Sequence, residues 1–385
     1  MTNNNTHTIY FSGLNGLRFF AALLVIITHI ELIKSNLGID NSWNNPFIEQ
    51  LGVIGVSFFF VLSGFLITYL LLIEKEKFKK ISIKKFYIRR ILRIWPLYFF
   101  IFILGFIILP MFPFFEIPYF SNQFYENYWQ NFILYLFIIP NLAFSMFSAV
   151  PLIGQSWSIG VEEQFYILWP LIIRLKKKIT FKFLFYLFTI VISLKIIVLM
   201  ISLNYIFDWI EVLKKFTAML KFENMIIGAM GALVLKNNKT NILKLIYNPI
   251  LFIFSFFCIF FLIYIIPNKF QDGKHIIDAI FFIIIILNIS SNPKSLISLE
   301  NKVFNFLGKI SYGIYMYHMI VIFISIKILN TSNLIEENYI IFNVVLYILS
   351  LGITILVSNI SYIYLEKRFL SLKSRYSNIE TSNNS

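Results

Sequence analysis

Long apolar runs are the feature that most restricts how this chain can fold. Several of them exceed the roughly 18 to 20 residues that an α-helix needs to cross a hydrocarbon core of about 30 Å. Of the 385 residues, 58% are hydrophobic and only 14% are charged, which leaves too little polar surface for a water-soluble domain. The sequence therefore predicts an all-α, polytopic membrane protein.

Positive charge is concentrated in short segments between the apolar runs. The densest segment is 74–93, and smaller clusters follow at 174–178, 236–244 and 367–375. Cytoplasmic loops of membrane proteins are enriched in Lys and Arg, so we place all four clusters in the cytoplasm. This topology accounts for the net charge of +14 and argues against a nucleic-acid partner.

With these clusters inside, the pattern predicts about ten transmembrane helices and two cytoplasmic termini. The predicted spans are 12–33, 50–73, 88–109, 156–174, 181–203, 215–235, 247–266, 274–290, 303–327 and 338–363. We expect a polar cytoplasmic leader at 1–10, a transmembrane domain at 11–370 and a disordered cytoplasmic tail at 371–385. The first span has no small-residue cleavage pattern and is expected to remain as a signal anchor.

The region 110–155 contains no Lys or Arg and is rich in Phe, Tyr, Pro and Asn. This composition predicts an extracytoplasmic loop that lies against the membrane surface. Its apolar stretch 131–147 is predicted to be interfacial or re-entrant, because a full crossing there would move Arg174 and the lysines after it to the outside. We expect this loop to cover a site.

An ionisable pair, Arg18 and His29, lies on the first apolar run. Eleven residues make about three helical turns, so the two side chains share one face and lie roughly 16 Å apart along the axis. Ionisable residues inside a membrane helix are costly and mark functional sites. We therefore expect the chemistry of this protein at His29.

The segment GQSWSIGVEEQFYILWP contains two adjacent carboxylates, Glu162 and Glu163. Neighbouring residues on a helix point about 100° apart, so only one of them readily faces an interior site, and we favour Glu162. Trp157 and Ser158 precede the pair, and Tyr166 follows it by one turn. The alternative is that the serine caps the helix and that the aromatic residues mark the membrane interface.

The segment RRILRIWPLY places Arg90 and Arg93 on one helix face at the cytoplasmic boundary. Two guanidinium groups at this spacing could bind phosphate oxygens. Ordinary anchoring of a helix end by positive charge would explain them equally well.

Two further polar groups lie in apolar runs. GKISYGIYMYHMIV contains Tyr315 and His318, which share a helix face, although His318 could also be a structural histidine. Lys221 and Glu223 are two residues apart. They cannot meet along one helix, so each needs another partner or water.

Depth along the predicted spans relates these groups to one another. At about 1.5 Å per residue, His29, Glu162, Glu223 and His318 fall in one layer in the outer half of the bilayer, whereas the three arginines lie at the cytoplasmic edge. This layout predicts a cleft with an anion-binding mouth inside and an acid/base centre nearer the outside.

Together these segments resemble the acyltransferase-3 family of membrane O-acyltransferases. The resemblance runs from about Leu14 to Leu365, and its blocks are the Arg18/His29 pair, GVSFFFVLSGFLI at 55–67, RRILRIWPLY, WSIGVEEQFYILWP and ISYGIYMYH. It implies a multi-pass bacterial enzyme of the cytoplasmic membrane that transfers an acyl group, usually acetyl from acetyl-CoA, to a hydroxyl of an extracytoplasmic glycan or lipid-linked saccharide.

The residues and the resemblance lead to one hypothesis. Arg18, Arg90 and Arg93 would bind the phosphates of acyl-CoA, His29 would be the general base, and Glu162 would orient the ring or the acceptor hydroxyl. No metal is expected, and membrane lipid is the surrounding partner. The residues predicted to support the site are Trp157, Ser158, Tyr166, Lys221, Glu223, Tyr315 and His318.

The chain departs from the family pattern in two places. It has Lys-Phe-Glu at 221–223 where the family often has Arg-Phe-Asp, and Met319 and Ile320 follow His318 where the family tends to have an apolar residue and Pro. Many relatives also continue into an extracytoplasmic serine-hydrolase-like domain, so we expect any such partner to be a separate protein.

Two other functions remain open from the sequence. In a proton-coupled transporter, intramembrane His, Glu and Lys would carry protons or substrate, and flux without acyl-CoA would favour that function. In a membrane scaffold, the polar residues would only join helices, and every assay would tolerate His29→Ala.

Overall fold

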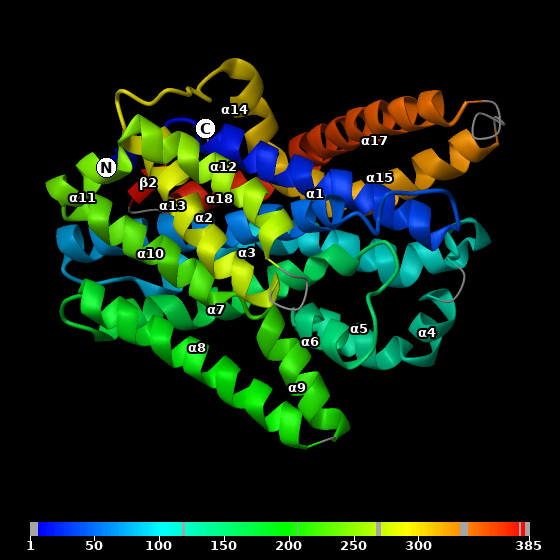
Figure 1. The fold of residues 1–385 in the computed structure, drawn as a ribbon, viewed down its shortest axis with the longest axis horizontal. Helices are drawn as coiled ribbons and strands as arrows, with labels where there is room; N and C mark the ends of the chain where they lie inside the picture. The colour runs from blue at the N-terminus through cyan, green and yellow to red at the C-terminus, as the bar shows by residue number, and fades with distance from the viewer. Residues whose placement is uncertain are drawn as a thin grey trace.

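A computed structural model describes residues 7–117, 120–205, 207–266, 271–331, 338–376 and 379–381. These residues are almost entirely helical (Figure 1), and the strands among them are β1 (His7–Ile9) and β2 (Ile379–Thr381). The predicted all-α, polytopic membrane fold is confirmed.

The longer helices, in chain order, are α1 (Leu14–Asn36), α2 (Pro46–Phe78), α3 (Ile83–Ile103), α7 (Trp157–Leu175), α8 (Phe181–Asn204), α9 (Asp208–Met219), α10 (Phe222–Lys236), α12 (Pro249–Ile265), α13 (Gln271–Ser291), α15 (Ser311–Asn330) and α17 (Tyr339–Ser361). The shorter ones are α4 (Phe120–Glu126), α5 (Tyr128–Leu136), α6 (Pro140–Met146), α11 (Thr240–Ile246), α14 (Lys302–Lys309) and α18 (Lys367–Lys373).

Eight helical segments in the described ranges are long and apolar enough to cross a membrane, and the bent pair of α11 and α12 would make a ninth. The predicted span 156–174 corresponds to α7, which has 19 residues. Every 18-residue stretch of α7 contains Glu162, Glu163 and Arg174, whereas each of those eight segments contains a stretch of that length with no more than two charged residues. Each predicted span thus has a helical counterpart, although 215–235 is divided between α9 and α10 and 303–327 between α14 and α15. The number of crossings stays a prediction.

The region 110–155 forms short helices. Of these, α5 has nine residues and α6 has seven, so neither is long enough to cross a bilayer. The interfacial or re-entrant position predicted for 131–147 stays a prediction. The side of the membrane on which the region lies stays a prediction.

Helix α2 is the centre of the bundle and packs most extensively against α1 and α10. Two glycines let the backbones of α2 and α10 touch. A Cβ added at Gly64 would collide with the backbone carbonyl of Met225, and one added at Gly228 would collide with that of Val61. Small residues of this kind allow close helix packing within membranes.

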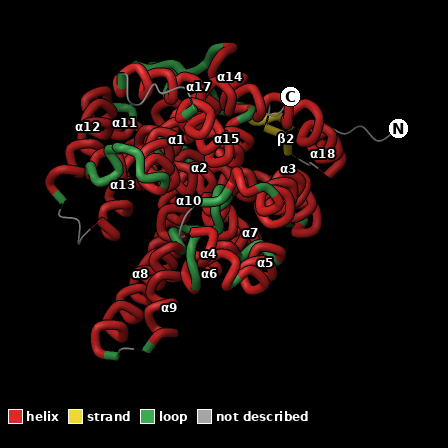
Figure 2. Tube along the Cα trace, turned by 90° about the vertical axis from the view of Figure 1, so that its right-hand side faces the viewer, coloured by secondary structure: helices red, strands yellow, loops and turns green. Residues whose placement is uncertain are grey.

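The hairpin of α8 and α9 projects from the rest of the bundle (Figure 2). Leu184 is the one residue of α8 that is buried, and the remaining apolar surface of this helix is suited to lipid. The two ends of the chain meet in a small parallel sheet, in which β1 pairs with β2 and Thr8 lies opposite Glu380. The limits predicted for the leader and the tail stay predictions.

Candidate active site

His29 of α1 is paired with His318 of α15. Nδ1 of His29 lies 2.6 Å from Nε2 of His318, and the two rings are nearly parallel, with 3° between their planes and 4.9 Å between their centroids. His318 is fully buried, whereas His29 remains partly accessible. The structure therefore brings together two of the predicted site residues from distant parts of the chain.

Tyr315 and Ser158 continue this polar group. The Tyr315 ring lies 5.7 Å from the His318 ring, and the Tyr315 and Ser158 hydroxyl oxygens are 2.7 Å apart. The Tyr315 hydroxyl also donates to the backbone carbonyl of Gln155 at 3.0 Å. Ser158 thus joins α7 to α15, and Gln155 is a contributor that sequence reasoning missed.

Glu162 lies in a second hydrogen-bonded group, one turn further along α7. Its carboxylate accepts hydrogen bonds from Ser63 and Tyr166, each at 2.8 Å, and the two hydroxyl oxygens are 2.6 Å apart. The hydrogen bonds of the described residues do not join Glu162 to His29. Its neighbour Glu163 points elsewhere and accepts from the Trp95 indole at 3.2 Å, in agreement with the expectation that only one of the two glutamates faces the site.

The three predicted arginines lie beyond Glu162. The Arg90 guanidinium carbon is 5.4 Å from the centroid of the Tyr166 ring, and Arg18 donates to Asn15 at 3.0 Å. Arg18 is close enough to Arg90 and Arg93 to be repelled by both and attracted by Glu162. The buried Nε of Arg90 has no hydrogen-bond partner among the described residues.

These groups form a polar column inside the bundle, in two hydrogen-bonded parts that adjoin because Ser158, Glu162 and Tyr166 follow one another at four-residue intervals on α7. It runs from the arginines through Glu162 and Tyr166 to Ser158 and Tyr315, and it ends at the histidine pair. Arg18, His29 and Glu162 are partly accessible although they belong to this interior column. Trp157 is also partly accessible, and its ring lies 6.1 Å from that of Phe60.

Glu223 and Lys221 belong to a separate cluster. Glu223 is fully buried and accepts from Lys195 and His275, each at 2.6 Å, and Lys221 Nζ lies 3.3 Å from the other ring nitrogen of His275. The common depth predicted for His29, Glu162, Glu223 and His318 stays a prediction, but Glu223 does not contact the other three. Depth along a helix gives no direction around it, and Glu223 faces α8 and α13 instead.

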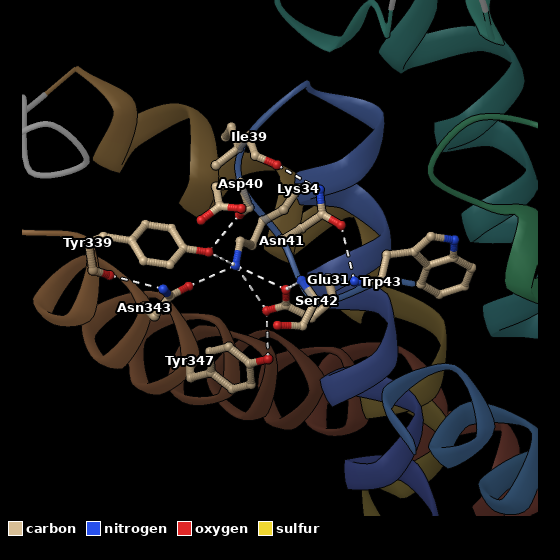
Figure 3. A network of polar contacts seen from close by, with 10 residues as sticks. All are labelled: Glu31, Lys34, Ile39, Asp40, Asn41, Ser42, Trp43, Tyr339, Asn343 and Tyr347. Atoms are coloured by element: carbon tan, nitrogen blue, oxygen red, sulfur yellow. Dashed lines mark hydrogen bonds and ion pairs between the residues drawn. The ribbon is translucent and has the colours of Figure 1, made fainter. Parts of the chain in front are cut away.

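A polar network fixes the end of α1 just beyond His29 (Figure 3). Buried Lys34 donates to both oxygens of buried Glu31 at 3.0 Å, to Tyr339 at 3.0 Å and to Asn343 at 2.8 Å. The Tyr347 hydroxyl donates to Glu31 at 2.8 Å. The network ties α1 to α17. Sequence reasoning missed it, although two opposite charges three residues apart in an apolar run could have revealed it.

Within the described ranges, no group of three or more His, Cys, Asp or Glu side chains is arranged to hold a metal ion. The polar column instead offers positive charge at one end and an accessible imidazole at the other.

Comparisons with known proteins find similarity over almost the whole chain. The family model for the acyltransferase domain matches residues 11–359. O-acetyltransferase OatA of Staphylococcus aureus strain NCTC 8325 / PS 47 is 28% identical over 386 residues, which cover 93% of this chain and 57% of that protein.

A second relative comes from Staphylococcus aureus strain COL, and its name describes it as a provisional O-acetyltransferase. It is 28% identical over 384 residues, which cover 94% of this chain and 57% of that protein. The chain therefore spans little more than half the length of these relatives. No solved structure is significantly similar to the chain.

Proposed function

Because this chain belongs to the acyltransferase-3 family, we propose that it is a bacterial membrane O-acyltransferase that moves an acyl group from acyl-CoA to a hydroxyl of a glycan or lipid-linked saccharide. The relatives named as O-acetyltransferases make acetyl the acyl group to test first. The proposal places the protein in the cytoplasmic membrane, with the donor entering from inside and the acceptor from outside.

The observation that carries this proposal is the position of His29 at the end of the polar column. His29 is partly accessible, and one of its nitrogens is held by His318 at 2.6 Å. Imidazole titrates near neutral pH and is the side chain most often used as a general base. About 16 Å of helix separates it from Arg18, a distance comparable with the reach of an extended pantetheine arm.

The arginine end of the column suits the phosphates of a CoA donor. Arg18, Arg90 and Arg93 bring three positive charges together, and the carboxylates of Glu162, Glu163 and Glu366 lie near them. The Arg90 Nε has no partner among the described residues, so it keeps a donor for a ligand. Guanidinium groups bind phosphate oxygens through paired, charge-assisted hydrogen bonds.

The chemistry assigned to His29 is proton transfer. Its free nitrogen takes the proton of the acceptor hydroxyl as the hydroxyl oxygen attacks the thioester carbonyl carbon. A C–O bond forms, the C–S bond breaks, and the CoA sulfur leaves with the bonding electrons. The sulfur then takes the proton from His29, so the base is restored.

We assign Glu162 a different role from the one that its sequence position suggests. Its hydrogen bonds run to Ser63 and Tyr166, and the Tyr166 ring lies beneath Arg90. Glu162 would therefore hold the arginine end in place, and orienting the His29 ring falls to His318. Trp157, Lys221 and Glu223 are assigned to support of the surrounding helices.

The test is acyl transfer by His29→Ala. Membrane vesicles that contain the protein would receive acetyl-CoA labelled in its acetyl group, and base-labile label in the glycan and lipid-linked saccharide fractions would be measured by mass spectrometry. We expect His29→Ala to reach normal levels in the membrane and to lose transfer. Ile27→Ala, which shortens a partly buried side chain of the same helix, is the matched control.

Normal labelling by His29→Ala would reject the base assignment. Proton-coupled flux of a saccharide through proteoliposomes without acyl-CoA would instead support a transporter.

A further inference from the structure

We propose that His318 is a positioning residue that fixes the tautomer of His29, so that His29 carries its proton on Nδ1 and keeps Nε2 free. This inference rests on the proposed function, because a free Nε2 matters only if His29 is the base. It adds a role for His318 that neither the family match nor the names of the relatives assign.

The distance between the two facing nitrogens requires a single proton between them when both rings are neutral. Nδ1 of His29 and Nε2 of His318 are 2.6 Å apart, which is hydrogen-bonding distance. In a neutral imidazole one nitrogen donates and the other accepts. Either His29 donates to His318, or His318 donates to His29.

The surroundings of the other His318 nitrogen decide between these two arrangements. That nitrogen, Nδ1, is buried and has no well-aligned partner among the described residues. The backbone carbonyls of Ile314 and Tyr315, which precede His318 by one turn of α15, lie near its ring, and because Nε2 faces His29, these carbonyls are on the Nδ1 side. A protonated Nδ1 is attracted by these oxygens, whereas a bare lone pair would be repelled. His318 therefore carries its proton on Nδ1, and its Nε2 must accept from His29.

The accessible edge of His29 is then the basic one. His318 covers Nδ1 of His29. Nε2 of His29 has no hydrogen bond within the described residues and is not one of their buried unpaired polar atoms, so it lies on the accessible edge of this partly accessible residue. When Nε2 takes a proton from a hydroxyl, the bond from Nδ1 to His318 remains in place and stabilises the charged ring. Partners that orient a histidine through its second nitrogen have this effect in many sites.

Nitrogen NMR can measure the tautomer directly in the intact protein. The chain has four histidines, so a sample labelled with ¹⁵N-histidine gives few ring signals, and the His29→Ala and His318→Gln spectra assign the two that matter. We expect both rings to carry the proton on Nδ1 in the unsubstituted protein. A His29 ring protonated on Nε2 would overturn the proposal, whatever the activity of any variant.

Substitution of His318 tests the same point through catalysis. His318→Leu removes the acceptor, and we expect kcat to fall about 10- to 100-fold with little change in KM for acetyl-CoA. His318→Gln places an amide oxygen near the position of Nε2, and we expect it to recover most of kcat. His275→Gln is the control, since His275 is a buried histidine that lies in the separate Glu223 cluster.

The failure of this inference is distinguishable from failure of the proposed function. Acyl transfer by His29→Ala would reject the assignment of His29 as the base. The NMR spectrum would still show which nitrogen of each ring carries the proton. Conversely, loss of transfer in His29→Ala together with equal kcat in His318→Leu and the unsubstituted protein would keep the base and reject its positioning. If His318→Leu does not fold, the spectrum of the unsubstituted protein decides the question.

Discussion

Substitution of Arg90 by Gln offers the sharpest test of the donor site. The Arg90 guanidinium is held by aromatic faces, 5.4 Å from the Tyr166 centroid and 5.6 Å from the Phe86 centroid. Contacts with ring faces leave the edge of the guanidinium free, and Nε has no partner among the described residues. Arg90 is thus placed without using the hydrogen-bond donors that a phosphate needs.

The size of the effect follows from the bonds that Gln cannot make. A hydrogen bond to a charged group contributes about 1.5–3 kcal/mol, and each 1.4 kcal/mol is about a tenfold change in binding. Arg90→Gln should therefore raise KM for acetyl-CoA about 10- to 150-fold. Since the lost contact lies far from the thioester and binds ground state and transition state alike, kcat should change little.

The assay is release of CoA thiol as a function of acetyl-CoA concentration, in membranes with matched amounts of protein. Lys84→Gln is the control, because Lys84 belongs to the same positive segment but is exposed. If Arg90→Gln changed KM by no more than Lys84→Gln does, the arginine would serve only topology, and the donor site would have to lie elsewhere.

Three further outcomes follow from the packing. Tyr166→Phe keeps the ring beneath Arg90 but removes its hydrogen bond to Glu162, so it should raise KM for acetyl-CoA by less than Tyr166→Leu, which removes both, as titration with acetyl-CoA would check. Gly64→Ala forces a Cβ into the α10 backbone and should cost about 1–3 kcal/mol; an unchanged melting temperature in detergent would contradict this. Lys34→Met leaves the buried Glu31 carboxylate without a positively charged partner. It should lower the free energy of unfolding by about 3–5 kcal/mol. The double change with Glu31→Gln should recover part of that loss in the same measurement.

The helices were predictable from the sequence because lipid allows few alternatives. A spanning segment must satisfy its own backbone hydrogen bonds, so apolar length alone locates α1, α2 and α8. Local interruptions were harder to predict. The break between α9 and α10 falls at Leu220 and Lys221, inside an apolar run in which neither Pro nor Gly marks it.

The candidate site was predictable only in part, for a geometric reason. Helical spacing relates residues on one helix, so Arg18 and His29 could be placed on one face, and Glu162 could be separated from Glu163. Contacts between helices depend on how each helix is rotated, which spacing does not give. The contact of His29 with His318 and the hydrogen bond between His275 and Glu223 could be found only from the three-dimensional structure.

The small sheet of β1 and β2 restricts the number of times that the chain can cross the membrane. Strands that pair at Thr8 and Glu380 must share one side of the bilayer, so the intervening polypeptide returns to its starting compartment. The number of passages between them is consequently even. Nine passages are incompatible with that parity, while eight or ten satisfy it, and two reporter groups attached at these strands should respond to the same membrane-impermeant quencher.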